Sequence, residues 1–111
     1  MDATSRAFTA LADPTRRALI ARLIEGEAQF TELASPFAMS KPAVVKHLRA
    51  LEAAGLVERL GTKARPVYRF LPHGLVAPLD WIEQHRRLWE ENLDSFATYA
   101  RSLTDQEGGT A

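Results

Sequence analysis

The stretch that decides the fold is Ser40–Val57, SKPAVVKHLRALEAAGLV. Ser40 can accept a hydrogen bond from the free N–H groups of a following helix, and Pro42 is tolerated in the first turn. Apolar residues then recur at i, i+4 and i+7 on one face, while the cations lie elsewhere. Gly55 ends the helix before an extended segment begins. A helix that packs by one side and offers cations on the other suits the major groove of DNA.

Two apolar-rich extended runs after this helix predict a β-hairpin. Residues 56–60 and 67–71 are separated by GTKARP, a turn rich in glycine, threonine and cations. A short helix, a tight turn, a longer helix and a hairpin follow one another in the order of a winged helix-turn-helix. We therefore expect a mainly α fold with a small β-hairpin, a recognition helix over about residues 40–54 and a wing over about residues 56–71.

Three helices are expected before the recognition helix, and a longer one is expected after the wing. Residues 5–12 can form a short first helix. Asp13 and Pro14 are typical of the start of a second helix, because aspartate caps free N–H groups and proline suits the first position. That helix is expected to run to about Glu25, and Thr31 is expected to cap a short third helix.

The region from about residue 74 to 103 predicts a long helix with an apolar seam whose spacing alternates between four and three, as in a coiled coil. A chain of 111 residues does not need so long a seam for its own core, so a second copy of the chain is the simplest partner. The residues expected at this dimer interface are Phe8, Leu79, Ile82, Trp89, Leu93 and Phe96. Residues 105–111 are polar and glycine-containing, and we expect a disordered tail there and a single domain over residues 1–104.

The charge is unevenly distributed, although the formal net charge is zero. Residues 41–71 carry seven basic side chains against two acidic ones, a net of +5, whereas residues 1–40 carry −1 and residues 72–111 carry −4. The local field steers a polyanion, so the zero total does not exclude DNA. The residues expected to contact DNA are Ser40, Lys41, Pro42, Ala43, Val45, Lys46, His47, Arg49, Arg59, Lys63, Arg65 and Arg69.

The polar residues of the recognition helix are expected to have two different roles, contact with phosphates and contact with base edges. Lys46 and Arg49 are expected to meet phosphates and fix the register. Lys41, at the helix start, and His47 are better candidates for contacts with base edges. A partly buried His47 that bonds to the neighbouring backbone is an equally good interpretation.

Cations outside this helix form a second group. Lys63 and Arg65 at the hairpin tip would lie over the adjacent minor groove or its phosphates, and the two strand arginines would extend the same stripe. Arg16 and Arg17 stand next to the positive end of the second helix. A phosphate contact is open to them, but a surface role is the expectation.

In the helices and the hairpin described above, the chain resembles the ArsR-type family of bacterial winged helix-turn-helix regulators. The resemblance covers about residues 6–103 and is carried by ALADPTRRALIARL, ELASPFAMSKPAVVKHLRALEAAGLVERL and the wing ending YRF. It implies a homodimer, assembled through the first and last helices, that binds an imperfect palindrome in double-stranded DNA. Such a dimer represses a nearby promoter until an effector or signal releases it, and it works in the bacterial cytoplasm, at the nucleoid when bound to DNA.

The chain departs from the metal-sensing members of that family. They commonly carry a cysteine pair in the third helix, where this chain has FTELAS, and the chain contains no cysteine, so it can form neither disulfides nor thiolate metal sites. Asp80 and His85 are five residues apart, on nearly opposite sides of a helix. We therefore expect no metal and no cofactor; a metal-responsive repressor with histidine and carboxylate ligands is the alternative. Val45 stands where many relatives place serine, and it could touch a thymine methyl.

Other classes of protein fit the sequence less well. It offers no nucleophile–base arrangement, glycine-rich phosphate loop or carboxylate pair in a cleft, so we do not expect an enzyme. No apolar run approaches membrane-spanning length, and a cytosolic protein is the default. Trp81 and Trp89 could line a ligand pocket, but we expect them to fill the dimer core. The alternative from another class is a winged-helix module that binds proteins and leaves DNA alone.

Overall fold

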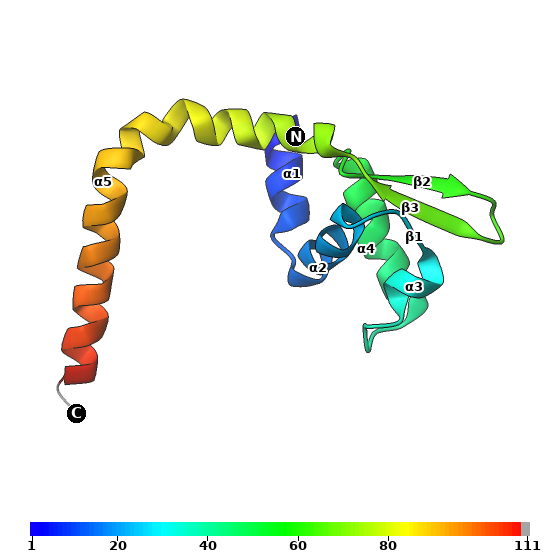
Figure 1. Ribbon diagram of the computed structural model, residues 1–111, viewed down its shortest axis with the longest axis horizontal. Coiled ribbons are helices and arrows are strands. Elements are labelled where there is room, and N and C mark those ends of the chain that lie inside the picture. The colour runs from blue at the N-terminus through cyan, green and yellow to red at the C-terminus, as the bar shows by residue number, and fades with distance from the viewer. Residues whose placement is uncertain (110–111) are drawn as a thin grey trace. The chain divides into compact units, whose positions relative to one another are not determined.

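The computed structural model describes the backbone of residues 1–109, with side chains for all of these except residues 87, 91 and 106–109. In chain order the elements are α1 (Ala3–Leu11), α2 (Pro14–Ile24), β1 (Ala28–Gln29), α3 (Phe30–Ala34), α4 (Lys41–Ala53), β2 (Val57–Gly61), β3 (Pro66–Phe70), the 3₁₀ helix η1 (Pro72–Leu75) and α5 (Val76–Gly109). This mainly helical arrangement with a small antiparallel sheet confirms the expected winged helix-turn-helix fold (Figure 1). The chain divides into two compact units, residues 1–79 and the residues from Asp80 onward.

Three helices begin directly behind side chains that cap them. Asp2, Asp13 and Ser40 accept hydrogen bonds from the backbone N–H groups of Ser5, Arg16 and Ala43, at 2.7, 3.1 and 3.3 Å. Each bond satisfies an N–H group that has no partner inside its helix. The caps of α2 and α4 are the expected ones, whereas α1 begins earlier than expected because Asp2 supplies its cap.

The start of α3 differs from the expectation. The prediction of Thr31 as its cap is wrong, because α3 begins at Phe30 and the preceding Gln29 makes no side-chain cap bond. Gln29 belongs to β1, a two-residue strand that the sequence pattern does not reveal, and it pairs with Val67 of β3. The chain therefore enters α3 directly from a sheet ladder, and no side-chain cap stands between them.

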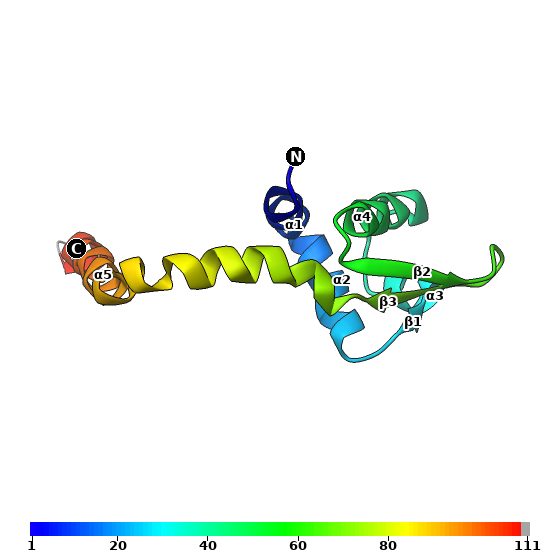
Figure 2. The ribbon, with the colours of Figure 1, turned by 90° about the horizontal axis from the view of Figure 1, so that it is seen from above.

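The sheet has the strand order β1-β3-β2, and both pairings are antiparallel. In the β2–β3 hairpin Arg59 lies opposite Tyr68, and Glu58 lies opposite Arg69. Because successive residues of a strand point to opposite faces, these two pairs lie on different faces of the hairpin. Figure 2 shows the hairpin extending beyond β1 and α3 to a turn whose residues, 62–65, are all exposed.

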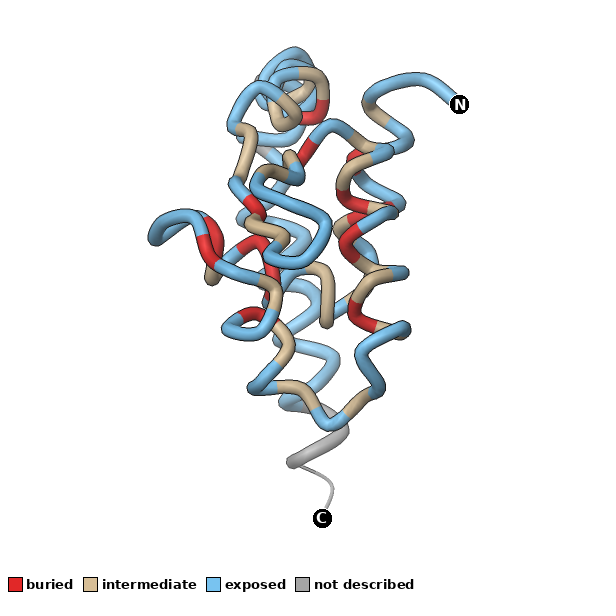
Figure 3. The backbone as a smooth tube through the Cα atoms, turned by 90° about the vertical axis from the view of Figure 1, so that its right-hand side faces the viewer, coloured by how far each residue is buried: buried red, intermediate tan, exposed pale blue. Residues whose placement is uncertain are grey.

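The core lies between the helices and the sheet of residues 1–79. Its largest fully buried side chains are Leu19, Leu33, Val44, Leu48, Leu51 and Leu56. Tyr68 adds its ring from β3 and is 4% exposed. Among the described side chains, every buried one belongs to this unit (red in Figure 3). The apolar face predicted for α4 is thus the face that packs on the core.

Two glycines make a close contact where α4 and η1 meet. Gly55 has a φ of +72°, a backbone conformation that favours glycine and ends α4 as expected. A Cβ atom at Gly74 would lie 2.2 Å from the carbonyl oxygen of Gly55, which is too close for any side chain. The main chain of η1 therefore rests directly on the main chain at the end of α4.

The long helix after the wing begins later and ends later than expected. Pro78 stands in the first turn of α5, where its missing N–H costs no hydrogen bond. We expect a disordered tail over residues 105–111, but residues 105–109 continue α5. The helix can extend this far because glycine, a poor helix former, appears only at 108 and 109. Residues 110 and 111 lie outside the described residues. Neither α5 nor any other described helix has the length and apolar character needed to cross a membrane.

Candidate nucleic-acid interface

The helix α4 exposes a cationic face opposite the core. Val44, Leu48 and Leu51 are 0% exposed and fix which side of α4 points inward. At about 100° per residue, the side opposite to them carries Lys46 and Arg49, and both are exposed. The structure thus keeps the predicted division of α4 into a packing face and a polar face.

A groove of about 510 Å³ separates α4 from the hairpin, and we call it the α4–wing groove. Its lining residues are Phe30, Val45, Arg49, Glu52, Arg59, Lys63, Pro66 and Tyr68. Cations from three different elements, α4, β2 and the hairpin turn, thus surround one carboxylate, that of Glu52. The groove brings the two segments predicted to contact DNA side by side, and it places Val45 on the wing side of α4.

The strand arginines do not form the single stripe that the sequence suggests. Arg59 lines the α4–wing groove together with Tyr68, the residue opposite it in the ladder. Arg69 lies on the other face of the hairpin and forms an ion pair with Glu58. Arg69 is therefore neutralised within the chain and is turned away from the groove.

The other cations of this block carry unneutralised charge. Among the described side chains, Arg69 is the only lysine or arginine of residues 41–71 that forms an ion pair, and its partner is Glu58. The six that form no ion pair with described residues are Lys41, Lys46, Arg49, Arg59, Lys63 and Arg65. Elsewhere, Arg22 is paired with Glu32, and Arg86 is paired with Glu83 and Glu90, whereas Arg6, Arg16, Arg17 and Arg101 form no ion pair with a described residue. Six of the ten described cations without an ion pair thus lie on α4 and the wing.

His47 lies on the flank of α4 that faces α2. Its side chain is 20% exposed, and its Nδ1 accepts a hydrogen bond from Nε of Arg16 at 3.2 Å. The carboxylate oxygen Oδ2 of Asp13 is 3.8 Å from the same nitrogen. The partner of His47 is therefore a side chain of α2 and not the neighbouring backbone, a contact that the sequence pattern does not indicate.

Asp13 is the acidic member of this cluster. The hydrogen bond from the backbone N–H of Arg16 is the largest cause that lowers the pKa of Asp13 below 3.8, and electrostatic attraction to His47, when its ring is protonated, adds to it. The carboxylate is therefore ionised at neutral pH while it caps α2.

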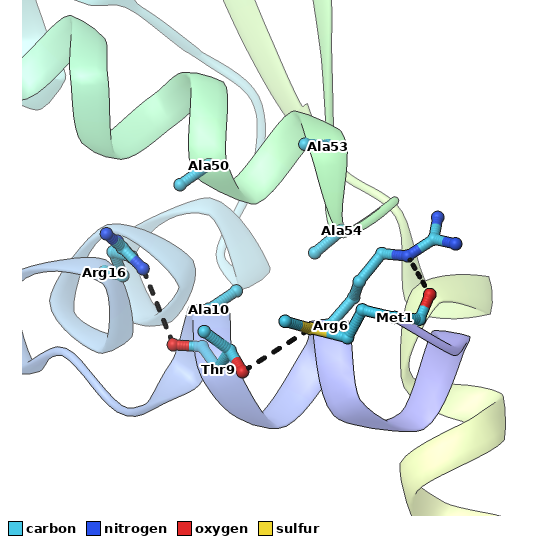
Figure 4. Close-up of a pocket in the computed structure, with 8 residues that line it drawn as sticks. All are labelled: Met1, Arg6, Thr9, Ala10, Arg16, Ala50, Ala53 and Ala54. Carbon is cyan, nitrogen blue, oxygen red and sulfur yellow. Dashed lines mark hydrogen bonds between the residues drawn. The ribbon is translucent and has the colours of Figure 1, made fainter.

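A small pocket of about 200 Å³ lies between α1 and the C-terminal half of α4 (Figure 4). Alanines form much of its lining, and the side chains of Arg6 and Arg16 border it. Both arginines donate to main-chain carbonyls: Nε of Arg6 to Met1 at 2.9 Å, and Nη1 of Arg16 to Thr9 at 3.5 Å. The two guanidinium groups thus fasten the ends of α1.

Asp80 and His85, the residues considered as metal ligands, belong to no cluster of three possible ligands among the described side chains. Among the described side chains, no three histidine, cysteine, aspartate or glutamate residues lie close enough to hold a metal ion. Nδ1 of His85 is 2.7 Å from the carbonyl oxygen of Trp81, and its ring stacks on the Trp81 ring at 4.3 Å. His85 is thus engaged by its own helix, and Trp89 contacts the Trp81 ring at an edge, 5.4 Å between centroids.

Comparison with known proteins agrees with the fold. Residues 13–59 match the family described as "Bacterial regulatory protein, arsR family". The chain is 40% identical over 103 residues to the HTH-type transcriptional regulator Rv2034 of Mycobacterium tuberculosis, which covers 93% of this chain and 90% of that protein. It is 36% identical over 77 residues to the HTH-type transcriptional repressor SmtB of the same species, covering 68% of this chain and 56% of SmtB.

Solved structures show the same likeness. The ArsR family transcriptional regulator RHA00566 superposes with a TM-score of 0.75 at 35% identity, covering 79% of this chain and 91% of that one. The homodimeric winged helix-turn-helix DNA-binding domain Mb0332 of Mycobacterium bovis, described as a possible ArsR-family regulator, gives a TM-score of 0.60 at 25% identity, covering 80% of this chain and 84% of that one.

Proposed function

Because the chain belongs to the ArsR family of bacterial transcriptional regulators and has its winged-helix DNA-binding domain, we propose that it is a homodimeric repressor of a palindromic operator. The observation that carries the proposal is the set of six cations on α4 and the wing that form no ion pair with any described residue. A polyanion with two parallel rows of phosphates is the partner that such a surface suits. The proposed contacts on α4 are Ser40, Lys41, Pro42, Ala43, Val45, Lys46, His47 and Arg49, and those on the wing are Arg59, Lys63 and Arg65.

The α4–wing groove supports a specific docking. With α4 in the major groove, one DNA backbone would pass between α4 and the hairpin, where Arg49, Arg59 and Lys63 lie. Glu52 in the same groove would repel a phosphate that comes too close, so the three cations would hold the backbone along the groove walls. Val45 would face the bases near this side of α4.

The apolar surface of α1 and α5 supports a homodimer. Phe8 on α1 is 42% exposed, and the apolar seam of α5 is exposed along its length. Exposures of the expected seam residues are Leu79 56%, Ile82 41%, Trp89 39%, Leu93 53% and Phe96 66%. An exposed apolar seam of this length on α5 marks an interface by itself. A second copy of the chain is the partner we propose, as in the homodimeric relative from Mycobacterium bovis.

The repressor role is proposed from the relative SmtB, whose name describes it as a repressor. A palindrome follows from the dimer, because two recognition helices related by a two-fold axis read two half-sites about 34–36 Å apart. Footprinting on the DNA that adjoins the chain's own gene should show two such half-sites. Transcription from the bound promoter in vitro should fall when the protein is added, and a rise would contradict repression.

The binding step itself is tested by titrating this DNA at several salt concentrations. We expect affinity to fall steeply with salt, since each neutralised phosphate releases a counterion. Arg49→Ala should weaken binding and reduce the salt dependence. Arg86→Ala removes the same charge from α5, where Arg86 is paired with Glu83 and Glu90, and should leave binding unchanged. Salt-independent binding, or equal effects of the two variants, would favour a protein-binding module over a DNA-binding one.

A further inference from the structure

The contact between Arg16 and His47 carries an inference about how α4 meets DNA. We propose that Arg16 is a positioning residue that holds His47 in the Nε2–H tautomer, so that His47 donates a hydrogen bond to a DNA phosphate beside α4. The inference rests on the proposed DNA-binding function and adds a contact and its support to it. It assigns His47 to the DNA backbone in place of the base edges, which are one of the two interpretations that the sequence leaves open.

The tautomer follows from the hydrogen bond that Nδ1 of His47 accepts from Arg16. An arginine N–H group can only donate, so Nδ1 of His47, which faces Nε of Arg16 at 3.2 Å, must be an acceptor. A neutral imidazole carries one proton, and the proton must then be on Nε2. The bond to Arg16 thus turns the outward nitrogen of His47 into a hydrogen-bond donor.

Arg16 also makes contacts beyond His47. Its backbone N–H donates to Asp13 at 3.1 Å, and its Nη1 donates to the carbonyl oxygen of Thr9 at 3.5 Å. Figure 4 shows the guanidinium reaching the main chain of α1 while the residue stands on α2. Arg16 therefore stands on α2 and donates from its side chain both to α1 and to His47 of α4.

The other nitrogen of His47 is open to the outside. No hydrogen bond joins Nε2 to a described residue, and no buried side-chain nitrogen or oxygen among the described residues lacks a partner. Nε2 is therefore accessible to solvent, in keeping with a side chain that is 20% exposed. A donor that is oriented from behind and accessible in front is suited to an incoming acceptor.

The position of His47 favours a phosphate over a base edge. The centre of the exposed face of α4 is at Lys46 and Arg49, and His47 lies about 100° away from Lys46, toward α2. The flank of a helix in the major groove faces the sugar–phosphate wall, where contacts fix orientation. The N-terminus of α2 begins beside His47 at Asp13, whose carboxylate caps the N–H groups there. Asp13 itself faces Nδ1, at the inner edge of the ring.

The tautomer is tested on the free protein by long-range proton–nitrogen NMR correlations at pH about 8.5, about two units above the ordinary histidine pKa. We expect Nε2–H for His47. His85 is an internal comparison with the opposite pattern, Nδ1–H, because its Nδ1 meets the carbonyl oxygen of Trp81, which can only accept. An Nδ1–H signature for wild-type His47 would overturn the proposal.

Two arginine variants separate positioning from charge. Arg16→Met keeps the length of the stem but removes every N–H donor, and we expect His47 to become a mixture of tautomers while His85 is unchanged. Arg17→Met is the matched control, since Arg17 carries the same charge on the next residue and donates to the carbonyl oxygen of Leu11 instead. If Arg16→Met leaves the His47 signature intact, Arg16 does not position it.

The phosphate contact is tested with DNA selected from a random library by the wild-type protein. His47→Leu should weaken binding to selected and random DNA equally, by about tenfold per half-site, as expected for one hydrogen bond to a charged group. His47→Gln should retain most of the affinity, because its amide N–H₂ can replace the Nε2–H donor. Replacing single phosphates by methylphosphonate should identify one phosphate per half-site that matters to wild type and not to His47→Leu.

The outcomes are distinguishable from failure of the proposed function. A loss confined to selected DNA would show a base contact and overturn the phosphate assignment. A failure of His47→Gln to restore affinity would overturn the donor role of Nε2. If wild-type protein binds no DNA at all, the proposed function and the phosphate contact fall together, while the NMR result still decides whether Arg16 sets the tautomer.

Discussion

The carboxylate of Glu58 binds the guanidinium of Arg69 across the β2–β3 hairpin, where the two residues are direct partners in the ladder. The adjacent partners, Arg59 and Tyr68, consequently lie on the other face and line the α4–wing groove. The two arginines thus point to opposite faces of the hairpin. The charge of Arg69 is neutralised by Glu58, whereas Arg59 forms no ion pair with a described residue.

This difference predicts unequal effects on DNA binding. Arg59→Ala should weaken binding to all sequences and lower the salt dependence by about one counterion per half-site, because a phosphate contact is lost. Arg69→Ala should change neither quantity much. Fluorescence anisotropy over a range of salt concentrations measures both. Equal losses in the two variants would mean that Arg69 leaves Glu58 when DNA binds.

The cations of α4 and the wing are expected to contribute differently to specificity. Lys41→Ala, at the start of α4, should narrow the gap in affinity between operator and random DNA by about 1–3 kcal/mol, because base edges are read there. Arg65→Ala, in the exposed hairpin turn, should weaken both kinds of DNA by about the same factor. Competition titrations with the two DNAs give this gap, and the reverse pattern would exchange the two roles.

A charge in the apolar seam of α5 is expected to separate the proposed dimer. Leu93→Asp should raise the dissociation constant about 100-fold or more, because an unpaired charge would be buried in the interface. Ser95→Asp adds the same charge on the exposed opposite side of α5 and should leave the dimer intact. Sedimentation equilibrium distinguishes the species. A monomeric wild type would refute the dimer, whatever the variants do.

The cap of α2 predicts an acid-dependent contribution to stability. The pKa of Asp13 is lowered in the folded chain, chiefly by the backbone N–H of Arg16, so ionised Asp13 stabilises the fold above its ordinary pKa of 3.8. This contribution is lost as the pH falls through the lower, folded-state pKa. Asp13→Asn keeps a capping oxygen without the charge, so it should be less stable than wild type near pH 7, and the difference should vanish in acid.

Urea unfolding at a fixed protein concentration, repeated at several pH values, measures this difference. Asp105→Asn serves as the control, since Asp105 is exposed and forms no hydrogen bond with a described residue. A difference between wild type and Asp13→Asn that stays constant down to pH 2 would show that the charge of Asp13 does not stabilise α2.

Local signals account for most of what the sequence predicts correctly. Two helix starts are set by side-chain caps, at Asp13 and Ser40, and one helix end is set by the backbone conformation of Gly55. Each of these signals acts within a few residues, and each lies where expected. The three buried positions of α4 follow from helix periodicity in the same way. The strand β1 is missed because two residues show no periodic pattern. It exists only by pairing with β3, whose residue Tyr68 lies far along the chain.

The candidate site is predicted less completely, because its remaining features depend on contacts between distant segments. Periodicity places His47 on a flank of α4, but it cannot identify Arg16, which is 31 residues away, as its partner. The faces of Arg59 and Arg69 depend on the hairpin register, and the register depends on the length of a turn whose limits the composition leaves open. The fold is therefore more predictable than the chemistry of its surface.

The contact between Gly55 and Gly74 has a consequence for the evolution of related chains. Position 74 has no room for a carbon atom while the carbonyl oxygen of residue 55 lies 2.2 Å from where that atom would be. A substitution of Gly74 must therefore be accompanied by a different path of the main chain after α4. Among relatives, a larger residue at this position should occur together with an insertion or deletion between α4 and β2, and the two changes should be inherited as a pair.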